Sequence, residues 1–379
     1  MHGVKRLFGW MIPRFDVSRF NVSLVSLRKK DLSEETLESL GIDITYLGKS
    51  KFDPTTLPAL LRVIRRKQID VLHLHGYGAT TFGRIAAGMH SIPAILHEHA
   101  NLTDTPWFQK VADAILERET DIAIAVSQST ADFVIKARQL PHDKVKVVYL
   151  GVPMEEFSRL RQPDEIASAR AELGTRADEF LVGSVTRLHE SKGNTHLVDA
   201  ARLVLEARPQ ARFLVIGEGP LQPELEAQAR RLGLGDRFVF GGFARDVARV
   251  VSAFDLSVFP SLWEGTPLTV FEALAMGKPI VATDADGLLD VLTHERDALI
   301  VPRRDAAALS AAIVRLMDDE AARRRLSAAA RLTSAQYDIA TFVAKMERLY
   351  DLLHRVSRAT HRRGVLGADL SFLTSRAPA

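Results

Sequence analysis

The chain has 379 residues, of which 46% are hydrophobic and 26% are charged, enough apolar material for two buried cores. Its 50 lysines and arginines nearly balance 47 aspartates and glutamates, and the formal charge of +3 disfavours nucleic acid as a partner. The absence of cysteine excludes disulfides and thiolate chemistry, and without a secretion signal or an apolar stretch long enough to cross a bilayer we expect a cytoplasmic protein.

Short runs rich in β-branched residues alternate with helical segments, a pattern typical of a parallel sheet flanked by helices. Six such runs lie in the first half of the chain and six in the second. We predict strands at 21–27, 42–47, 71–75, 93–99, 122–126 and 145–150, and at 180–185, 213–217, 238–240, 256–260, 279–283 and 298–301. The sequence therefore predicts an α/β fold in which one Rossmann-like architecture occurs twice.

A connection between the two halves is indicated at 151–164, where glycine and prolines interrupt the periodicity. We place the first domain at 1–157 and the second at 158–335. A helix at 336–358 is expected to pack back toward the first domain, and 359–379 is expected to be a flexible tail.

The segment 260–278, PSLWEGTPLTVFEALAMGK, predicts a strand whose end leads through a turn into a helix. Ligands bind beyond the carboxyl ends of strands in open α/β sheets, and a helix that begins there directs free N–H groups at an anion. Glu264 precedes the helix and Glu272 lies within it, so the two carboxylates can address different parts of one ligand. By spacing alone, Glu264 could instead be a helix-dipole partner and Glu272 a solvated helix residue.

A second loop favours the ligand interpretation. The segment 183–193, GSVTRLHESKG, places Arg187 and Lys192 after the first strand of the second half. Arginine offers a bidentate fork and lysine a compact charge, so two such cations near a helix N-terminus suit a diphosphate. Considered alone, both could be ordinary exposed loop residues.

Residues 180–335 resemble the donor domain of the GT-B glycosyltransferases, specifically the retaining family four, the glycosyl transferases group 1. The resemblance rests on TRLHESKG, VIGEGP and EGTPLTVFEALAMGKP, in that order along the chain. It implies two Rossmann-like domains facing each other across a cleft, and a metal-independent hexosyltransferase that moves a sugar from a nucleoside diphosphate sugar to an acceptor hydroxyl. It also implies retention of anomeric configuration, a glycan or lipid-linked acceptor, a role in polysaccharide or glycolipid biosynthesis, and no cofactor besides the sugar nucleotide.

The same resemblance implies roles for individual residues. Arg187 and Lys192 would bind the donor diphosphate, Glu272 would bind the ribose hydroxyls, and Glu264 would face the transferred sugar. We assign Arg187, Lys192 and Glu264 to the catalytic set as well. Backbone N–H groups lining the sugar and the distal phosphate would come from Gly265, Thr266, Leu268 and Thr269.

Four histidines lie near the ends of two strands of the first half, in DVLHLH at 70–75 and PAILHEH at 93–99. The family resemblance places His99 where an acceptor-side catalytic histidine stands, and His97 is the alternative. Purely structural histidines are a further interpretation. We expect no metal site, because no carboxylate arrangement accompanies these histidines.

The amino-terminal segment departs from the family pattern of an opening strand followed by a glycine-rich loop. This sequence opens at MHGVKRLFGWMIPRF, and only Gly3 remains of the expected glycine pair. We expect a missing first strand, a loop remnant leading into a helix, and an exposed sheet edge. The alternative function is therefore a catalytically inactive partner subunit that binds a sugar nucleotide.

A basic amphipathic helix is predicted at 57–67, where leucines and isoleucine alternate with Arg62, Arg65, Arg66 and Lys67. One interpretation is peripheral contact with anionic lipid, at the inner face of the plasma membrane. The other is a helix that packs its leucines inward and leaves its cations solvated.

Overall fold

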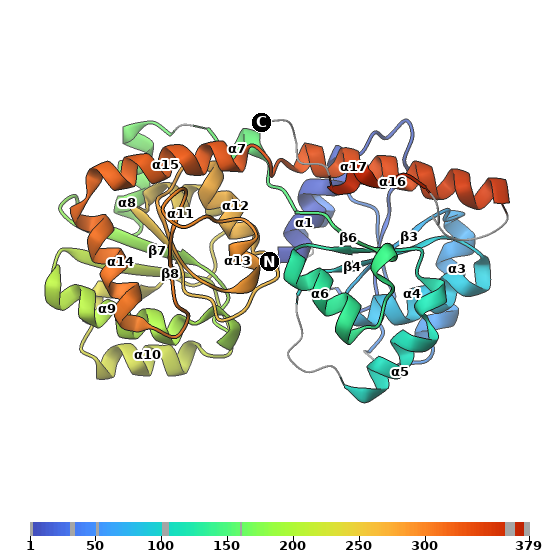
Figure 1. Cartoon of the computed structure of the whole chain (residues 1–379), viewed down its shortest axis with the longest axis horizontal. Helices are drawn as coiled ribbons and strands as arrows, with labels where there is room; N and C mark the ends of the chain where they lie inside the picture. The colour runs from blue at the N-terminus through green and yellow to red at the C-terminus, as the bar shows by residue number, and fades with distance from the viewer. Residues whose placement is uncertain are drawn as a thin grey trace. The chain divides into compact units, whose positions relative to one another are not determined.

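The computed structural model describes residues 3–30, 35–50, 53–100, 106–159, 161–360 and 368–374. The chain forms two compact units (Figure 1). The first unit combines Met1–Gly151 with Asp338–Pro378, and the second is Val152–Tyr337. From the sequence, these divisions were placed at 157/158 and 335/336, a few residues away in each case.

The second unit is built on one six-stranded parallel sheet. All six strands predicted in this half are present, so the prediction is confirmed apart from small shifts of their ends. The strands are β7 (Phe180–Val185), β8 (Ala211–Ile216), β9 (Phe238–Phe240), β10 (Leu256–Phe259), β11 (Ile280–Thr283) and β12 (Leu299–Val301).

The strand order in this sheet is β12-β11-β10-β7-β8-β9. The chain runs outward from β7 to β9, then returns to the other side of β7 and continues outward through β10 to β12. The strand order therefore reverses between β7 and β10. In open α/β sheets this reversal separates the loops at the carboxyl ends of the two strands and leaves a crevice for a ligand.

Helices cover both faces of this sheet (Figure 1), as right-handed crossovers require. The apolar faces of these helices pack on the sheet, and Leu197, Val204 and Leu225 are buried in one core with strand residues such as Phe213. The helices of the unit are α7 (Met154–Phe157), α8 (Pro163–Glu172), α9 (Asn194–Ala207), α10 (Gln222–Arg231), α11 (Val247–Ala253), α12 (Leu268–Ala275), α13 (Asp286–Leu289), α14 (Ala306–Asp318) and α15 (Glu320–Ser334), with 3-10 turns at Glu190–Lys192 and Gly235–Arg237.

The first unit also contains the six predicted strands, but they form two parallel sheets where one was expected. One sheet pairs β1 with β2, and the other has the order β3-β4-β5-β6. Within the described residues, no strand ladder joins β1 to β3. The strands are β1 (Leu24–Ser26), β2 (Ile44–Tyr46), β3 (Leu72–His75), β4 (Ala94–Glu98), β5 (Ile122–Ala125) and β6 (Val145–Val147).

The amino-terminal segment is helical. Helix α1 covers Gly3–Met11, so the predicted helix is confirmed, but Gly3 belongs to it and not to a loop remnant; Met1 and His2 lie outside the described residues. Leu7 and Phe8 of α1 are buried, which anchors the helix in the unit. The other helices before the second unit are α2 (Glu35–Ser39), α3 (Thr56–Lys67), α4 (Tyr77–His90), α5 (Trp107–Ile115) and α6 (Gln128–Ala137), with 3-10 turns at Ile12–Arg14, Glu117–Glu119 and His142–Lys144.

The carboxyl-terminal segment contributes α16 (Ile339–Thr360) and α17 (Ser371–Thr374) to the first unit. On α16, Tyr350 stacks on Phe15, with ring centroids 5.7 Å apart. The expectation of a flexible tail is wrong for α17, because Leu373 is fully buried. Of the remaining predicted tail, 361–367 and 375–379 lie outside the described residues.

A buried ionic network holds the end of β4. Asp113 on α5 accepts a hydrogen bond from Arg138 Nε at 2.9 Å and pairs with Arg84, and these three side chains are at most 1% exposed. Arg138 Nη1 donates to Glu98 at 2.7 Å. Because a buried charge without a partner is strongly destabilising, the network fixes the backbone immediately before His99.

Candidate functional site

The predicted donor-site loops lie at the reversal of strand order in the second unit. Arg187 and Lys192 follow the carboxyl end of β7, and Glu264 follows the carboxyl end of β10. Since β7 and β10 are neighbours in the sheet, the two loops meet at one edge. Leu262 N–H donates to Ser191 O at 2.8 Å, which ties the two loops together.

Lys192 and Glu264 are brought together as an ion pair between Lys192 Nζ and Glu264 Oε1. The same carboxylate oxygen accepts a hydrogen bond from Ser261 Oγ at 2.9 Å. Their side chains are only 14% and 8% exposed, so the pair is largely shielded from water. A cation held in place at low exposure is preorganised to stabilise negative charge on a bound ligand.

Arg187 is exposed at the start of the same loop. Among the described residues, no hydrogen bond or ion pair links its guanidinium to Lys192 or Glu264. Its carbonyl oxygen accepts a hydrogen bond from Asn194 Nδ2 at 3.3 Å, which fixes the backbone beneath the side chain. Arg187 therefore lies on the same loop as Lys192, and its role in binding a diphosphate stays a prediction.

Helix α12 begins next to Glu264. Pro267 is its N-cap residue, and the helix starts at Leu268. The first N–H groups of any helix have no intrahelical partner, so those of Leu268 and Thr269 are positioned to bind an anion. Gly265 and Thr266 form the turn between Glu264 and this helix start.

Glu272 lies inside α12 and is fully buried. The interpretation of Glu272 as a solvated helix residue is therefore wrong. The carboxylate therefore lies inside the unit, about one turn from the helix N-terminus. The ribose-binding role implied by the family resemblance stays a prediction.

Glycines let the loops of the site approach closely. A Cβ atom on Gly217, which has a φ of +132°, would lie 1.8 Å from the carbonyl oxygen of Thr186. A Cβ atom on Gly219 would lie 2.2 Å from the carbonyl oxygen of Leu188. These contacts explain the VIGEGP motif, because the loop after β8 packs directly against the loop that carries Arg187.

Arg303, which follows β12, is a cation that the sequence analysis missed. Its guanidinium donates to Leu262 O at 2.8 Å, to Asp284 Oδ1 at 3.0 Å and to Asp286 Oδ1 at 3.1 Å. It thereby connects the loops that follow β10, β11 and β12. No motif marks this residue, because its partners lie in two other segments, after β10 and after β11.

The four predicted histidines are also brought together, three of them on β3 and β4 and His99 directly after β4. His75 Nδ1 lies 2.8 Å from His99 Nε2, and His73 Nε2 lies 3.0 Å from His97 Nδ1. Burial lowers the pKa of His99 to about 4, so its imidazole is neutral near pH 7. His97 is 1% exposed whereas His99 is half-buried, so His99 is the more accessible of the two catalytic candidates.

Comparisons with known proteins cover both units. Residues 12–156 match the model of Glycosyltransferase Family 4, and residues 165–333 match that of Glycosyl transferases group 1. The glycosyltransferase MJ1607 of Methanocaldococcus jannaschii is 30% identical over 284 residues, which cover 72% of this chain and 73% of that protein. An Escherichia coli UDP-Gal:alpha-D-GlcNAc-diphosphoundecaprenol alpha-1,3-galactosyltransferase is 25% identical over 278 residues, 71% of each chain.

Among solved structures, HepE of Anabaena in complex with UDP and glucose has a TM-score of 0.83 at 23% identity, covering 92% of this chain and 96% of that chain. The shared architecture is the GT-B fold. The family models and the named relatives show that the protein is a glycosyltransferase of the hexosyltransferase type. The chain belongs to the family of glycosyl transferases group 1. The alternative of an inactive partner subunit gains no support from these matches.

Proposed function

We propose that this glycosyltransferase uses a nucleoside diphosphate sugar and binds the donor diphosphate between Lys192 and the N-terminus of α12. The observation that carries the proposal is the shielded pair of Lys192 and Glu264 at the reversal of strand order. Two similar proteins support it by name: HepE is described in complex with UDP-glucose, and the Escherichia coli relative takes UDP-Gal.

In this proposal the ion pair is a resting arrangement. A diphosphate carries more negative charge than one carboxylate, so it takes Lys192 from Glu264, and Glu264 then faces the sugar. Arg187 turns onto the diphosphate from its exposed position, and Glu272 binds the ribose hydroxyls. Two cations and the free N–H groups of α12 neutralise the leaving group, so transfer requires neither a metal ion nor a cofactor besides the sugar nucleotide.

We further propose that His99 acts on the acceptor side and that the sugar is transferred with retention. A neutral imidazole can accept a hydrogen bond or a proton from an acceptor hydroxyl. The acceptor is a glycan or a lipid-linked glycan, by analogy with the relative whose name includes diphosphoundecaprenol. This places the enzyme in polysaccharide or glycolipid biosynthesis.

The test is a transfer reaction followed by NMR. The protein is incubated with UDP-sugars and GDP-sugars of known anomeric configuration and a lipid-linked glycan extract, and the coupling constant of the new anomeric proton is measured. We expect one nucleotide class to be consumed and the product to keep the donor configuration. An inverted product overturns retention alone, whereas consumption of no sugar nucleotide by folded protein overturns the donor assignment.

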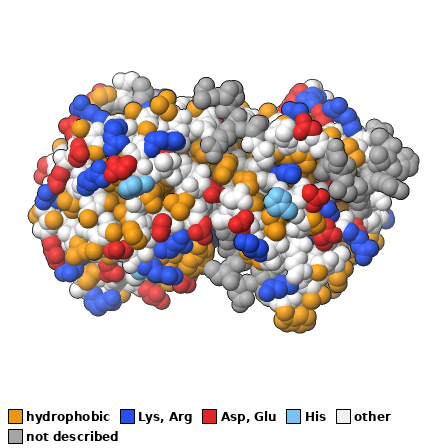
Figure 2. Space-filling model, in the orientation of Figure 1, with side chains coloured by type: hydrophobic (Ala, Val, Ile, Leu, Met, Phe, Trp, Pro, Cys, Tyr) orange, Lys and Arg blue, Asp and Glu red, His pale blue; other side chains and the backbone are white. Residues whose placement is uncertain are grey.

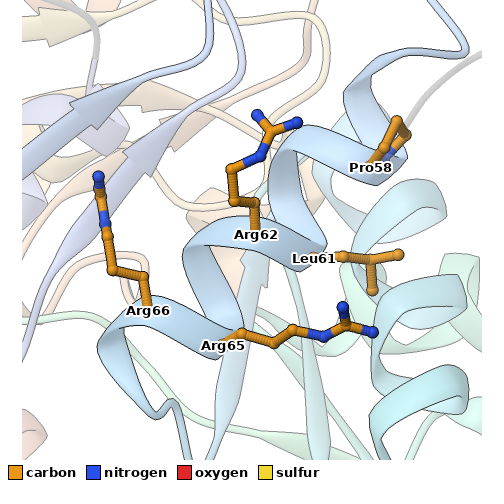
Figure 3. A pocket seen from close by; sticks show the side chains of 5 residues that line it. All are labelled: Pro58, Leu61, Arg62, Arg65 and Arg66. Carbon is orange, nitrogen blue, oxygen red and sulfur yellow. The ribbon is translucent and has the colours of Figure 1, made fainter.

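We also propose a cytoplasmic enzyme in peripheral contact with the membrane. No helix among the described residues is long and apolar enough to cross a bilayer. On α3, Leu60 and Ile64 are buried, which confirms inward packing, while Arg62, Arg65 and Arg66 are exposed. Figure 3 shows the surface pocket of α3 that these arginines line together with Pro58 and Leu61.

Helix α5 presents apolar side chains to solvent. Trp107, Val111 and Ile115 are spaced four residues apart and are 76%, 49% and 61% exposed, and Phe108 is 40% exposed. Figure 2 shows hydrophobic side chains gathered over α5. An exposed stripe with tryptophan and phenylalanine suits the boundary between lipid headgroups and acyl chains, and the arginines of α3 suit anionic headgroups.

Replacing both Trp107 and Ile115 with serine is expected to weaken binding to vesicles that contain anionic lipid by at least about tenfold. Each of these side chains contributes roughly 1.5–3 kcal/mol when it is transferred from water into an apolar phase. Vesicle co-sedimentation measures the binding. The control is Leu332→Ser in the second unit, a leucine that is 77% exposed; equal vesicle binding by the double variant and the control would remove α5 from the lipid contact.

A further inference from the structure

Three imidazole rings converge where β3 and β4 run side by side. His73 and His75 point to the same face of β3, because they are two residues apart, and His75 is in register with His97 on β4. One ring nitrogen from each histidine lies within 4.8 Å of those of the other two. Small changes of the side-chain torsions would place each of the three nitrogens about 2 Å from one shared ion, which is the usual distance between an imidazole nitrogen and zinc.

Hydrogen bonds from neighbouring residues orient two of these rings. His73 Nδ1 lies 2.6 Å from the hydroxyl of Tyr350, and His75 Nδ1 lies 2.8 Å from His99 Nε2. In both rings the Nδ1 atom is occupied, and Nε2 of His73 faces Nδ1 of His97. Metal-binding histidines have the same arrangement, in which the outer nitrogen bonds to a nearby polar group and fixes the tautomer and the ring orientation.

The third ring has a nitrogen that the protein does not satisfy. His97 is 1% exposed, its Nδ1 is 3.0 Å from His73 Nε2, and its buried Nε2 has no hydrogen-bond partner among the residues that the structure describes. The hydroxyl of Tyr350 can donate to His73 Nδ1 or accept from it, and each choice fixes which nitrogen of His97 carries the proton. Nε2 of His97 stays unpaired in both cases. The nitrogen of His97 that faces His73 is Nδ1, so Nδ1 is the atom through which His97 would bind an ion shared with His73.

We propose that His73, His75 and His97 form a binding site for one divalent transition-metal ion, with zinc as the first candidate. Imidazole nitrogen suits zinc, copper, nickel and cobalt, whereas magnesium and calcium require oxygen ligands. The neutral form of an imidazole has the lone pair that binds a metal ion. Three histidines leave a fourth position for water or hydroxide.

This proposal differs from the expectation based on sequence, which found no metal site because no carboxylate accompanied the histidines. The sequence could not show which groups hydrogen-bond to the histidines, because Tyr350 lies 277 residues from His73 along the chain. The site belongs to the first unit, and the proposed donor site belongs to the second. Metal binding can therefore be tested independently of the proposed function.

The experiment is a titration of the full chain, freed of metal with a chelator and dialysed, with ZnCl2 by calorimetry and with CoCl2 by visible absorption. We expect wild type to bind one zinc ion, and cobalt to give the absorption of a nitrogen-ligated tetrahedral complex. Two variants of His97 are measured, because His97→Ala leaves a cavity whereas His97→Phe keeps a ring in place. Both are expected to lose at least a hundredfold in affinity.

Two further variants test whether the histidines bind a metal ion or only pack against one another. Tyr350→Phe retains the ring but removes the hydroxyl beside His73, so zinc affinity should fall roughly tenfold. His142→Ala, at an exposed position in the same unit, should bind zinc like wild type. Absence of zinc binding by wild type, or wild-type affinity in a folded His97→Phe variant, overturns the proposal.

Discussion

Replacing Lys192 with alanine is expected to lower kcat/KM by at least about a hundredfold. Preorganised groups that stabilise charge on a leaving group typically contribute effects of this size. The variant also leaves the carboxylate of Glu264 shielded and without a counter-charge, so its negative charge repels the donor diphosphate. Initial rates are measured with the sugar nucleotide that gives turnover, with release of nucleoside diphosphate as the signal.

Two variants serve as comparisons for Lys192→Ala. Lys192→Arg retains the positive charge in a bulkier group, so its kcat/KM should lie between wild type and the alanine variant. Arg208→Ala removes an exposed cation of the same unit that pairs with Asp318 at 2.6 Å, and should leave the rate unchanged. A rate for Lys192→Ala close to that of wild type would show that this pair does not contact the donor.

Replacing Gly287 with alanine is expected to weaken donor binding by about a hundredfold or more. A Cβ atom at this position in α13 would lie 1.4 Å from the carbonyl oxygen of Gly265 and 2.9 Å from that of Glu264. The overlap is with backbone atoms, so no side-chain rotation relieves it. The turn that leads to α12 must move, and a displacement of about 1 Å at a reacting site can reduce the rate about a hundredfold.

The control for this prediction is Gly233→Ala at the end of α10. Gly233 has a φ of +67°, but an added Cβ would meet no atom within 4 Å. The substitution therefore introduces backbone strain of about 1–2 kcal/mol without moving a loop of the site. Calorimetry and thermal unfolding are measured for both variants. If Gly287→Ala binds nucleotide as Gly233→Ala does, the turn at Gly265 does not shape the donor site.

The second unit was predictable because its information is local. A few neighbouring residues are enough to predict each strand end, the glycine motif and the turn that contains Glu264. The pairing of β7 with β10 then brings these segments together. The sequence did not reveal the burial of Glu272, because a glutamate on a helix is usually solvated. It also did not reveal Arg303, whose hydrogen-bond partners follow two other strands, β10 and β11.

The first unit was less predictable because its defining contacts are long-range. Charged side chains usually lie on the surface. Three of them, Arg84, Asp113 and Arg138, are buried here because they pair with one another. The division of six strands into two sheets depends on strand pairing, which the pattern of apolar residues does not specify. The convergence of His73, His75 and His97 depends on the register of β3 against β4.

Calorimetric titration with UDP and GDP, of wild type and of Lys192→Ala, tests the central claim most directly. The account predicts that wild type binds one molecule of at least one of these nucleotides, and that Lys192→Ala binds it at least about a hundredfold more weakly, or about 2.7 kcal/mol. Folded wild-type protein that binds neither nucleotide, or equal affinity in the two proteins, would contradict the account.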